Sequence, residues 1–116
     1  MEFDVILIFG VIFLRDVKSI TNDLLVINKL LKSNGKMFIN FRTTYDYLYQ
    51  TGQKIDDNTF ILENEYKDAV YSFFNLDEAK ELLINTGFKI ENIEREDYYK
   101  DNLHKHNSWW MLQVTK

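Results

Sequence analysis

The feature that most constrains this chain is an apolar run near its beginning, Phe3–Leu14, in which Val, Ile, Leu and Phe follow Asp4 and only Gly10 interrupts them. Apolar runs without polar alternation are typical of strands covered on both faces, as in the parallel sheet of an α/β fold. The glycine marks the place where the strand ends and the backbone turns or comes close to another group. The sequence therefore predicts a core strand, which needs neighbouring strands and covering layers from the rest of the chain.

Signal peptides and membrane spans also contain apolar runs, but two features favour a buried strand. Val5–Leu14 is ten residues long, whereas a spanning helix needs about 20. The residues before it include Glu2 and Asp4 instead of basic residues, and no small-residue cleavage site follows. We therefore expect no membrane partner.

The composition predicts a single folded domain over residues 1–116. Hydrophobic residues make up 46% of the sequence and aromatic residues 16%, which is enough for a buried core. The net charge is −4 without a basic block, and phosphate binding needs clustered Lys and Arg, so no nucleic-acid partner is expected. The lack of cysteine excludes disulfides, thiolate catalysis and cysteine zinc sites, and is compatible with a cytoplasmic protein.

A helix and a second strand follow the apolar run. Within Arg15–Asn34, apolar residues recur at three- and four-residue spacing, namely Ile20, Leu24, Ile27, Leu30 and Leu31. Asp16 or Ser19 would cap the start, and Gly35 would stop the helix in a left-handed conformation. Lys36–Phe41 is then a short strand. Strand, helix and strand form a βαβ unit, whose two strands should be parallel.

The middle of the chain, Arg42–Tyr71, gives mixed signals. Its alternating tyrosines are Tyr45, Tyr47 and Tyr49. Their spacing is that of a strand, but the segment suits a short helix equally well. Thr59–Leu62 is a candidate strand that would pair in a hairpin with Ala69–Phe73.

Regular structure resumes at Asn75. Asn75 and Glu78 form a capping-box pattern at the start of a helix that ends at Gly87. Phe88–Glu94 alternates apolar and charged residues, as in a strand exposed on one face. Trp109–Val114 would be the final strand, antiparallel to the one before it, with its two tryptophans on opposite faces.

Four stretches carry a further signal through their order and spacing. They are Phe3–Val11, Leu30–Ile39, Phe73–Ile90 and Trp109–Val114. Together they resemble the C-terminal half of a class I S-adenosylmethionine-dependent methyltransferase. The family usually has Leu-Lys-Pro-Gly-Gly where this chain has Leu-Lys-Ser-Asn-Gly, so Ser33 and Asn34 depart from the pattern.

The resemblance implies an α/β fold: a partial Rossmann-like methyltransferase sheet, mostly parallel with an antiparallel C-terminal strand, with helices packed on it. The spatial order would be first strand, second strand, last strand and the Phe88–Glu94 strand, so the first strand lies at an open edge. The family holds its cofactor mainly with its N-terminal half, through a glycine-rich turn and an acidic residue. This chain has no G-x-G sequence. The single domain would thus be a C-terminal half without the Gly-rich half.

The same resemblance implies S-adenosylmethionine as cofactor, with its methionine end near the loop after the first strand. The candidate cofactor-binding residues are Phe9, Gly10, Val11 and Ile12. The candidate substrate-facing residues are Arg42, Tyr45, His104 and His106. Either histidine could serve as a general base, but no catalytic residue is assigned. Two histidines without a third ligand do not predict a metal site.

A structural interpretation of these residues stays open beside the functional one. Gly10 would then be a turn with core neighbours, and the histidines ordinary surface residues. Two functions are accordingly open: an S-adenosylmethionine-dependent methyltransferase that is incomplete for cofactor binding on its own, or a non-catalytic, degenerate methyltransferase-fold module. In either case Val5–Phe9, as an exposed apolar strand edge, would be the surface for a dimer or a protein partner.

Overall fold

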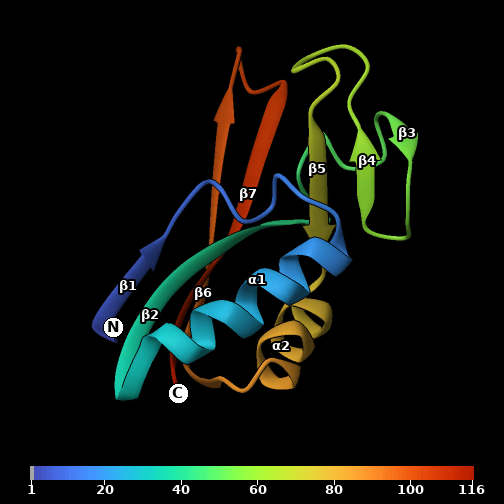
Figure 1. The fold of residues 1–116 in the computed structure, drawn as a ribbon. Helices are drawn as coiled ribbons and strands as arrows, with labels where there is room; N and C mark the ends of the chain where they lie inside the picture. Colours follow the sequence, from blue (N-terminus) through green and yellow to red (C-terminus); the bar gives the residue numbers. More distant parts are fainter. Residues whose placement is uncertain (1) are drawn as a thin grey trace.

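The fold is organised around one long strand, β2 (Leu31–Thr43), in a computed structural model that describes residues 2–116. One edge of β2 pairs in parallel with β1 (Phe3–Ile8) and, nearer its carboxyl end, with β5 (Val70–Phe74). The other edge pairs antiparallel with β7 (Lys105–Thr115), which pairs in turn with β6 (Lys89–Lys100). Figure 1 shows β2 curving across the molecule between these neighbours.

Two short strands, β3 (Gln53–Lys54) and β4 (Thr59–Ile61), extend the sheet beyond β5. The predicted order β1, β2, β7, β6 and the antiparallel last strand are confirmed. The expectation of a mostly parallel sheet is not confirmed: over residues 2–116, four of the six strand pairings are antiparallel. The sheet is mixed because β3, β4 and β5 follow one another through short turns, without crossover helices.

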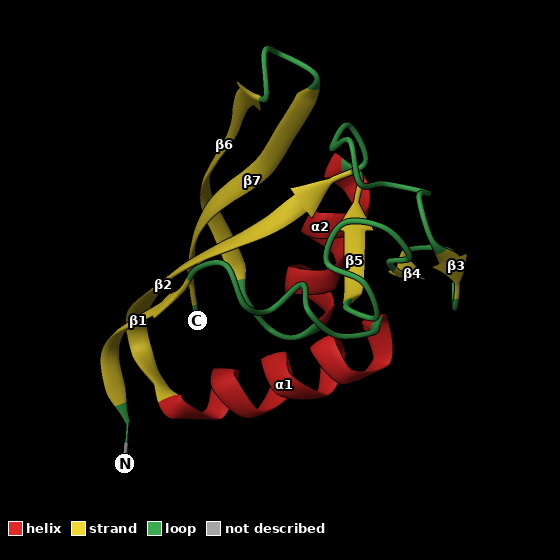
Figure 2. Cartoon of the chain, turned by 90° about the horizontal axis from the view of Figure 1, so that it is seen from above, coloured by secondary structure: helices red, strands yellow, loops and turns green. Residues whose placement is uncertain are grey.

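Both helices pack on the same face of the sheet, as Figures 1 and 2 show. α1 (Val17–Leu30) begins at Asp16, whose carboxylate accepts the Ser19 N–H at 2.8 Å. α2 (Leu76–Asn85) begins with the predicted capping box, in which the Asn75 and Glu78 side chains accept each other's backbone N–H. Neither α1 nor α2 has the length and apolar character that a membrane crossing demands.

The first helix ends four residues before the predicted end, because β2 starts directly at Leu31. Leu31 is extended, fully buried and paired with Phe3, so its apolar side chain belongs to the strand. The left-handed stop expected at Gly35 is wrong, and Asn34 has the positive φ of 65° instead. Gly35 is needed for space: a Cβ there would lie 2.8 Å from Leu31 Cδ1.

The apolar side chains form two clusters. The larger one lies between the sheet and the two helices, and it includes Ile12 and Trp110. The smaller one contains Phe13, Leu48, Phe60, Leu62, Tyr71 and Phe73, with Trp109 packed against it. Trp109 and Trp110 thus join different clusters, as expected for neighbours on a strand.

Two segments differ from expectation, the alternating tyrosines and the end of β6. The alternating tyrosines lie in a series of turns, neither strand nor helix. The predicted hairpin of Thr59–Leu62 with Ala69–Phe73 is confirmed by the pairing of β4 with β5. β6 runs on to Lys100, beyond the predicted Glu94, and forms a long hairpin with β7 that projects past the helices in Figure 1.

Candidate functional site

The loop that follows β1 is fixed at both ends by neighbouring strands. Gly10 has a φ of +74°, and its N–H donates to Asn40 Oδ1 on β2 at 2.8 Å. At the far end, Ser72 of β5 donates its N–H to the Phe13 carbonyl at 2.8 Å and its hydroxyl to the Arg15 carbonyl. The loop therefore has a defined conformation at the carboxyl edge of β1, which is where ligands bind in open α/β sheets.

The four candidate cofactor-binding residues in this loop have different environments. Phe9 and Val11 are exposed, and an added Cβ at Gly10 would meet no atom within 4 Å. Ile12 is only 5% exposed and packs in the larger core cluster, so that it supports the loop from behind. The surface available to a ligand here is thus Phe9, Gly10 and Val11.

Arg42, near the carboxyl end of β2, is buried in a box of aromatic rings. Its guanidinium carbon lies 4.4 Å from the ring centre of Trp109 and 5.2 Å from those of Phe13 and Tyr71. Its Nη1 donates to Asp46 Oδ2 at 2.7 Å. Because cation–π contacts and a buried ion pair occupy this side chain, the structure places it inside the protein instead of at a substrate-facing surface.

Asp46 connects the end of β2 to the beginning of β7. Besides Arg42, it accepts the N–H of Leu48 at 3.0 Å and the N–H of Ser108 at 3.0 Å. Thr43 adds a second link, since its hydroxyl donates to Ser108 Oγ at 2.7 Å. These bonds satisfy a carboxylate that is entirely buried, and they fix the relative position of the two strand ends.

Tyr45 and His106 lie in one polar and aromatic cluster beside the same strand ends. His106 Nε2 is 2.7 Å from Asp97 Oδ1, and Arg95 Nε is 2.8 Å from Asp97 Oδ2. The Arg95 guanidinium lies over the Tyr45 ring at 4.6 Å, and Tyr99 stacks on the imidazole at 4.5 Å. An imidazole oriented by a carboxylate is an arrangement suited to a general base.

The charges of this cluster are fixed by hydrogen bonding. Burial by itself raises the pKa of Asp97, but hydrogen bonds from Ser108, His106 and Arg95 outweigh it and hold that pKa below the ordinary 3.8. The hydrogen bond with Asp97 raises the pKa of Arg95. Asp97 is therefore ionised at neutral pH and remains an acceptor for both neighbours.

Tyr47, Glu65 and Lys105 form a second polar group between the turns and β7. Tyr47 Oη donates to Glu65 Oε2 at 2.8 Å, and Lys105 Nζ lies 3.1 Å from the same oxygen. Burial, and then the hydrogen bond with Glu65, raise the pKa of Tyr47 far above its ordinary value. The hydrogen bond from Tyr47 lowers the pKa of Glu65. Tyr47 therefore stays a neutral donor at neutral pH, and its bond to Glu65 joins two parts of the turn region.

Of the four candidate substrate-facing residues, the structure brings only Tyr45 and His106 into one cluster; Arg42 is enclosed, and His104 is exposed in the turn between β6 and β7. Sequence reasoning missed Asp97, although its i, i+2 spacing from Arg95 on a strand places both on one face. It also missed Asn40 and Asp46, for which the sequence carries no comparable signal. Within residues 2–116, no three His, Asp or Glu side chains are arranged to hold a metal ion.

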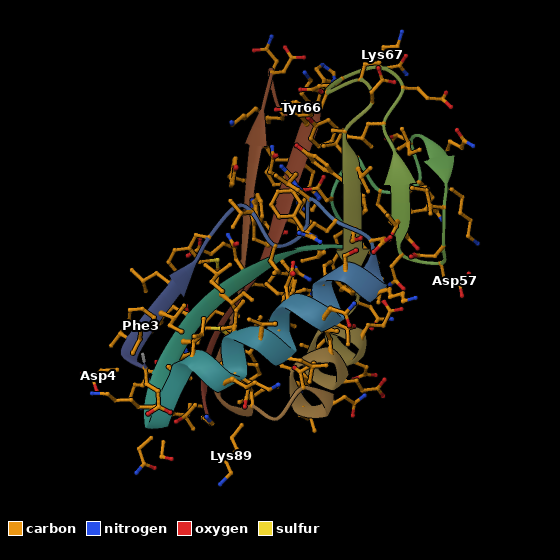
Figure 3. All side chains as sticks on the ribbon, in the orientation of Figure 1. Phe3, Asp4, Asp57, Tyr66, Lys67 and Lys89 are labelled. Carbon is orange, nitrogen blue, oxygen red and sulfur yellow. The ribbon has the colours of Figure 1, made fainter. Side chains whose placement is uncertain are left out.

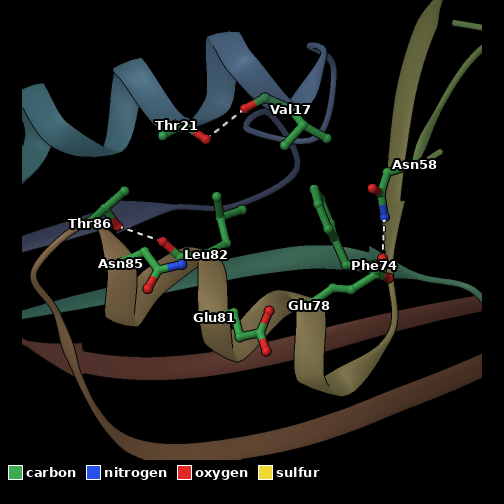
Figure 4. A pocket seen from close by; sticks show the side chains of 9 residues that line it. All are labelled: Val17, Thr21, Asn58, Phe74, Glu78, Glu81, Leu82, Asn85 and Thr86. Atoms are coloured by element: carbon green, nitrogen blue, oxygen red, sulfur yellow. Dashed lines mark hydrogen bonds between the residues drawn. The ribbon is translucent and has the colours of Figure 1, made fainter. Parts of the chain in front are cut away.

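A groove of about 270 Å³ lies between the two helices and reaches Phe74, the last residue of β5 (Figure 4). α1 contributes Val17 and Thr21, and α2 contributes most of the opposite wall. Some of its polar side chains have partners within the chain: Thr21 donates to the Val17 carbonyl at 2.8 Å, and the Asn58 amide donates to Glu78 Oε2 at 2.9 Å. The first bond lies within α1, and the second joins the residue before β4 to the first turn of α2.

Comparison with known proteins identifies the fold. No protein-family model matches the sequence, and no curated protein matches it. An S-adenosylmethionine-dependent methyltransferase from Methanosarcina mazei superposes with a TM-score of 0.78 at 14% identity, over 99% of this chain and 59% of that chain. A Burkholderia thailandensis 1,6-didemethyltoxoflavin-N1-methyltransferase, solved with bound 1,6-didemethyltoxoflavin and S-adenosylhomocysteine, superposes with a TM-score of 0.69 at 19% identity. The match covers 99% of this chain and 44% of that chain. A Clostridium acetobutylicum S-adenosylmethionine-dependent methyltransferase gives 0.66 at 14% identity, over 98% and 58%.

The predicted resemblance to part of a class I S-adenosylmethionine-dependent methyltransferase is confirmed at the level of the fold. The chain matches these proteins over nearly its whole length, and it spans roughly half of theirs.

Proposed function

We propose that this chain is the C-terminal half of an S-adenosylmethionine-dependent methyltransferase, completed by further polypeptide beside β1. The observation that carries the proposal is the match of 99% of this chain to 59% of the Methanosarcina mazei methyltransferase at a TM-score of 0.78. The completing polypeptide would supply the Gly-rich cofactor-binding half, which this sequence does not contain.

The residues after β1 fit one wall of a cofactor site. Phe9 and Val11 present apolar side chains to solvent, and Gly10 leaves the backbone open to close approach. S-adenosylmethionine, when bound, supplies an electrophilic methyl group, and catalysis of its transfer rests mainly on positioning. In this proposal Phe9 and Val11 exclude water on their side, while Asn40 fixes the loop through the Gly10 N–H. Charged and ribose-binding contacts would come from the completing half.

We place the methyl acceptor beside Tyr45 and His106. His106 is held by Asp97 at 2.7 Å, so its ring orientation is defined before any substrate arrives. The imidazole would accept a proton from an acceptor that must lose one. Arg42 and Asp46 would act indirectly, by fixing the two strand ends that carry these side chains.

The outer edge of β1, marked by Phe3 in Figure 3, supports the idea of a completing polypeptide. β1 pairs with β2 on one side, and within residues 2–116 no strand pairs with its other side. Val5 is 54% exposed and Leu7 64% exposed. An apolar, unpaired strand edge is a template for a further strand.

The test is isothermal titration of S-adenosylhomocysteine into two proteins: this chain, and the chain produced together with the coding sequence upstream of Met1. We expect no saturable heat from the chain alone, since it forms one wall of the site, and stoichiometric binding from the longer protein. Val11→Ala should weaken that binding, whereas Leu103→Ala, an exposed leucine in the β6–β7 turn, should leave it unchanged. Tight binding by the chain alone would refute the proposal that the cofactor site is shared with the completing half. No binding by the longer protein would refute the proposal that it is a methyltransferase.

A second candidate function is a non-catalytic module that associates with itself or with a protein partner through Val5–Phe9. The exposed β1 edge favours it, because two such edges can pair with each other. Light scattering of the purified chain tests this candidate function. A stable dimer that Leu7→Lys abolishes would support a self-associating module, and a monomer at high concentration would argue against pairing of two β1 edges.

A further inference from the structure

Asn34, which departs from the methyltransferase pattern, is the only asparagine in the sequence that is followed by glycine. This pair of residues has a chemistry of its own. The backbone nitrogen that follows an asparagine can attack the carbonyl carbon of the asparagine side chain, and Gly35 has no Cβ to obstruct that approach. The reaction needs a side chain that is free to turn toward the next nitrogen, so the surroundings of Asn34 decide whether it occurs.

The start of β2 bulges at this point. β2 is paired with β1 at Leu31 and then again from Lys36, and the register shifts between these two places. On the other edge, pairing with β7 begins only at Lys36. Within residues 2–116, the segment 32–35 therefore has no register partner on either side, and it lies beside the first residues of β1 (Figure 1). A bulge leaves its extra residues outside the hydrogen-bond ladder, so strand pairing does not fix the backbone of Asn34.

The side chain of Asn34 is exposed, and no hydrogen bond within residues 2–116 holds its amide. Asn40 of the same strand, by contrast, accepts the Gly10 N–H at 2.8 Å. Asn34 has a φ of 65°, in the left-handed region that asparagine adopts more readily than most residues with a side chain. The amide of Asn34 can therefore rotate toward the Gly35 nitrogen without losing a contact.

We propose that Asn34 is a site of spontaneous deamidation, which introduces aspartate or isoaspartate into the bulge of β2. The Gly35 nitrogen gives its proton to hydroxide and forms a bond to Asn34 Cγ. The bond from Cγ to the side-chain nitrogen breaks, and that nitrogen leaves as ammonia after it takes a proton from water. Water then opens the cyclic imide, at Cγ to give aspartate or at the main-chain carbonyl to give isoaspartate. In total one water is consumed and one ammonia is released.

The two products differ in their effect on the surrounding contacts. Aspartate leaves the main chain unchanged and adds a negative charge. Isoaspartate adds the same charge, but it directs the main chain through the former side chain, which lengthens the chain by one carbon and displaces Gly35. That residue is tightly enclosed: a Cβ there would lie 2.8 Å from the Lys32 carbonyl oxygen and 3.1 Å from that of Asp4, and its carbonyl accepts the Thr115 hydroxyl at 2.8 Å. Isoaspartate should therefore weaken the contacts of β2 with β1 and β7.

The purified chain is incubated in buffers of increasing pH, and its chymotryptic peptides are analysed by mass spectrometry. Asn102 is the matched internal control, because it is exposed and has a φ of 53° but is followed by Leu103. We expect conversion of amide to acid to be at least about tenfold faster at Asn34 than at Asn102. The rate should rise about tenfold per pH unit, because the attacking nitrogen must lose its proton. Leu103→Gly should make Asn102 reactive, and Asn34→Gln should abolish conversion at its own position.

Equal conversion at Asn34 and Asn102 would overturn the proposal, as would conversion at Asn34 in urea but not in the folded chain. The isoaspartate form, isolated by chromatography, should unfold at a lower urea concentration than Asn34→Asp, which carries the same charge on an unchanged main chain. Equal unfolding midpoints would overturn the expected effect on β2. No cofactor or second polypeptide takes part in the reaction, so its outcome is independent of the proposed function.

Discussion

Removing the charge of Asp46 should destabilise the protein more than any other conservative polar substitution near the strand ends. Asp46 is fully buried, and it is the acceptor for Arg42 Nη1 at 2.7 Å. Asp46→Asn leaves the guanidinium inside the aromatic box without a counter-charge. Breaking a buried ion pair in this way costs about 3–5 kcal/mol, which is a large share of the roughly 5–15 kcal/mol that holds a domain folded.

Arg42→Met should cost less, about 1–3 kcal/mol. Asp46 then keeps the N–H groups of Leu48 and Ser108, and methionine keeps apolar contact with the surrounding rings. The double variant should therefore lose much less than the sum of the single losses, with a coupling energy of at least about 1.5 kcal/mol.

Urea unfolding followed by tryptophan fluorescence gives the free energy of unfolding of the unchanged protein, the two single variants and the double variant. The signal is suitable because Trp109 is part of the aromatic box. A loss of 4 kcal/mol at an m-value of about 2 kcal/mol/M lowers the midpoint by about 2 M. The matched control is the exposed pair Arg95 and Asp97, where Arg95→Met and Asp97→Asn should couple by less than about 1 kcal/mol. A coupling energy below about 0.5 kcal/mol for Arg42 and Asp46 would refute the reasoning.

Three further predictions concern single positions. Asn40→Ala removes the acceptor of the Gly10 N–H, and should lower the free energy of unfolding by about 1 kcal/mol and speed hydrogen exchange at that amide; unchanged exchange would contradict the assigned bond. Gly35→Ala places a Cβ 2.8 Å from Leu31 Cδ1, and should cost about 1–3 kcal/mol in thermal unfolding; an equally stable variant would argue against tight packing there. Because the pKa of Asp97 is held below 3.8, its contribution to stability is complete above that pH and is lost as the pH falls through the folded-state value. Asp97→Asn should therefore flatten the acid limb of stability in urea unfolding at several pH values, and an unchanged slope would count against the lowered pKa.

The starts of the helices could be predicted from the sequence because they depend on local bonds. Asp16 and the capping box at Asn75 act within three residues of themselves. The end of α1 could not be predicted in the same way. Leu31 continues the helical spacing of apolar residues, yet it is equally suited to a buried strand, and pairing with β1 decides between them. Strand pairing between distant segments leaves little trace in local periodicity.

The candidate site shows the same division. Gly10 was identifiable as a turn, because an isolated glycine ending an apolar run marks a break. The environment of Arg42 could not be predicted from the sequence, because its three aromatic partners come from β7, β5 and the loop after β1. The extension of β6 to Lys100 was missed since both faces of that hairpin are polar, which removes the alternation that normally marks a strand.

The central place of β7 has a consequence for synthesis of the protein. Within residues 2–116, β7 follows all the other strands in sequence, but it lies between β2 and β6 and pairs residues as distant as Lys36 and Thr115. On the ribosome, β1, α1 and β2 emerge long before β7 can pair with them. During that interval one edge of β2 stays unpaired, and pairing of distant segments is slow. The time between the synthesis of β2 and that of β7 is therefore the period in which the nascent chain most needs protection from aggregation.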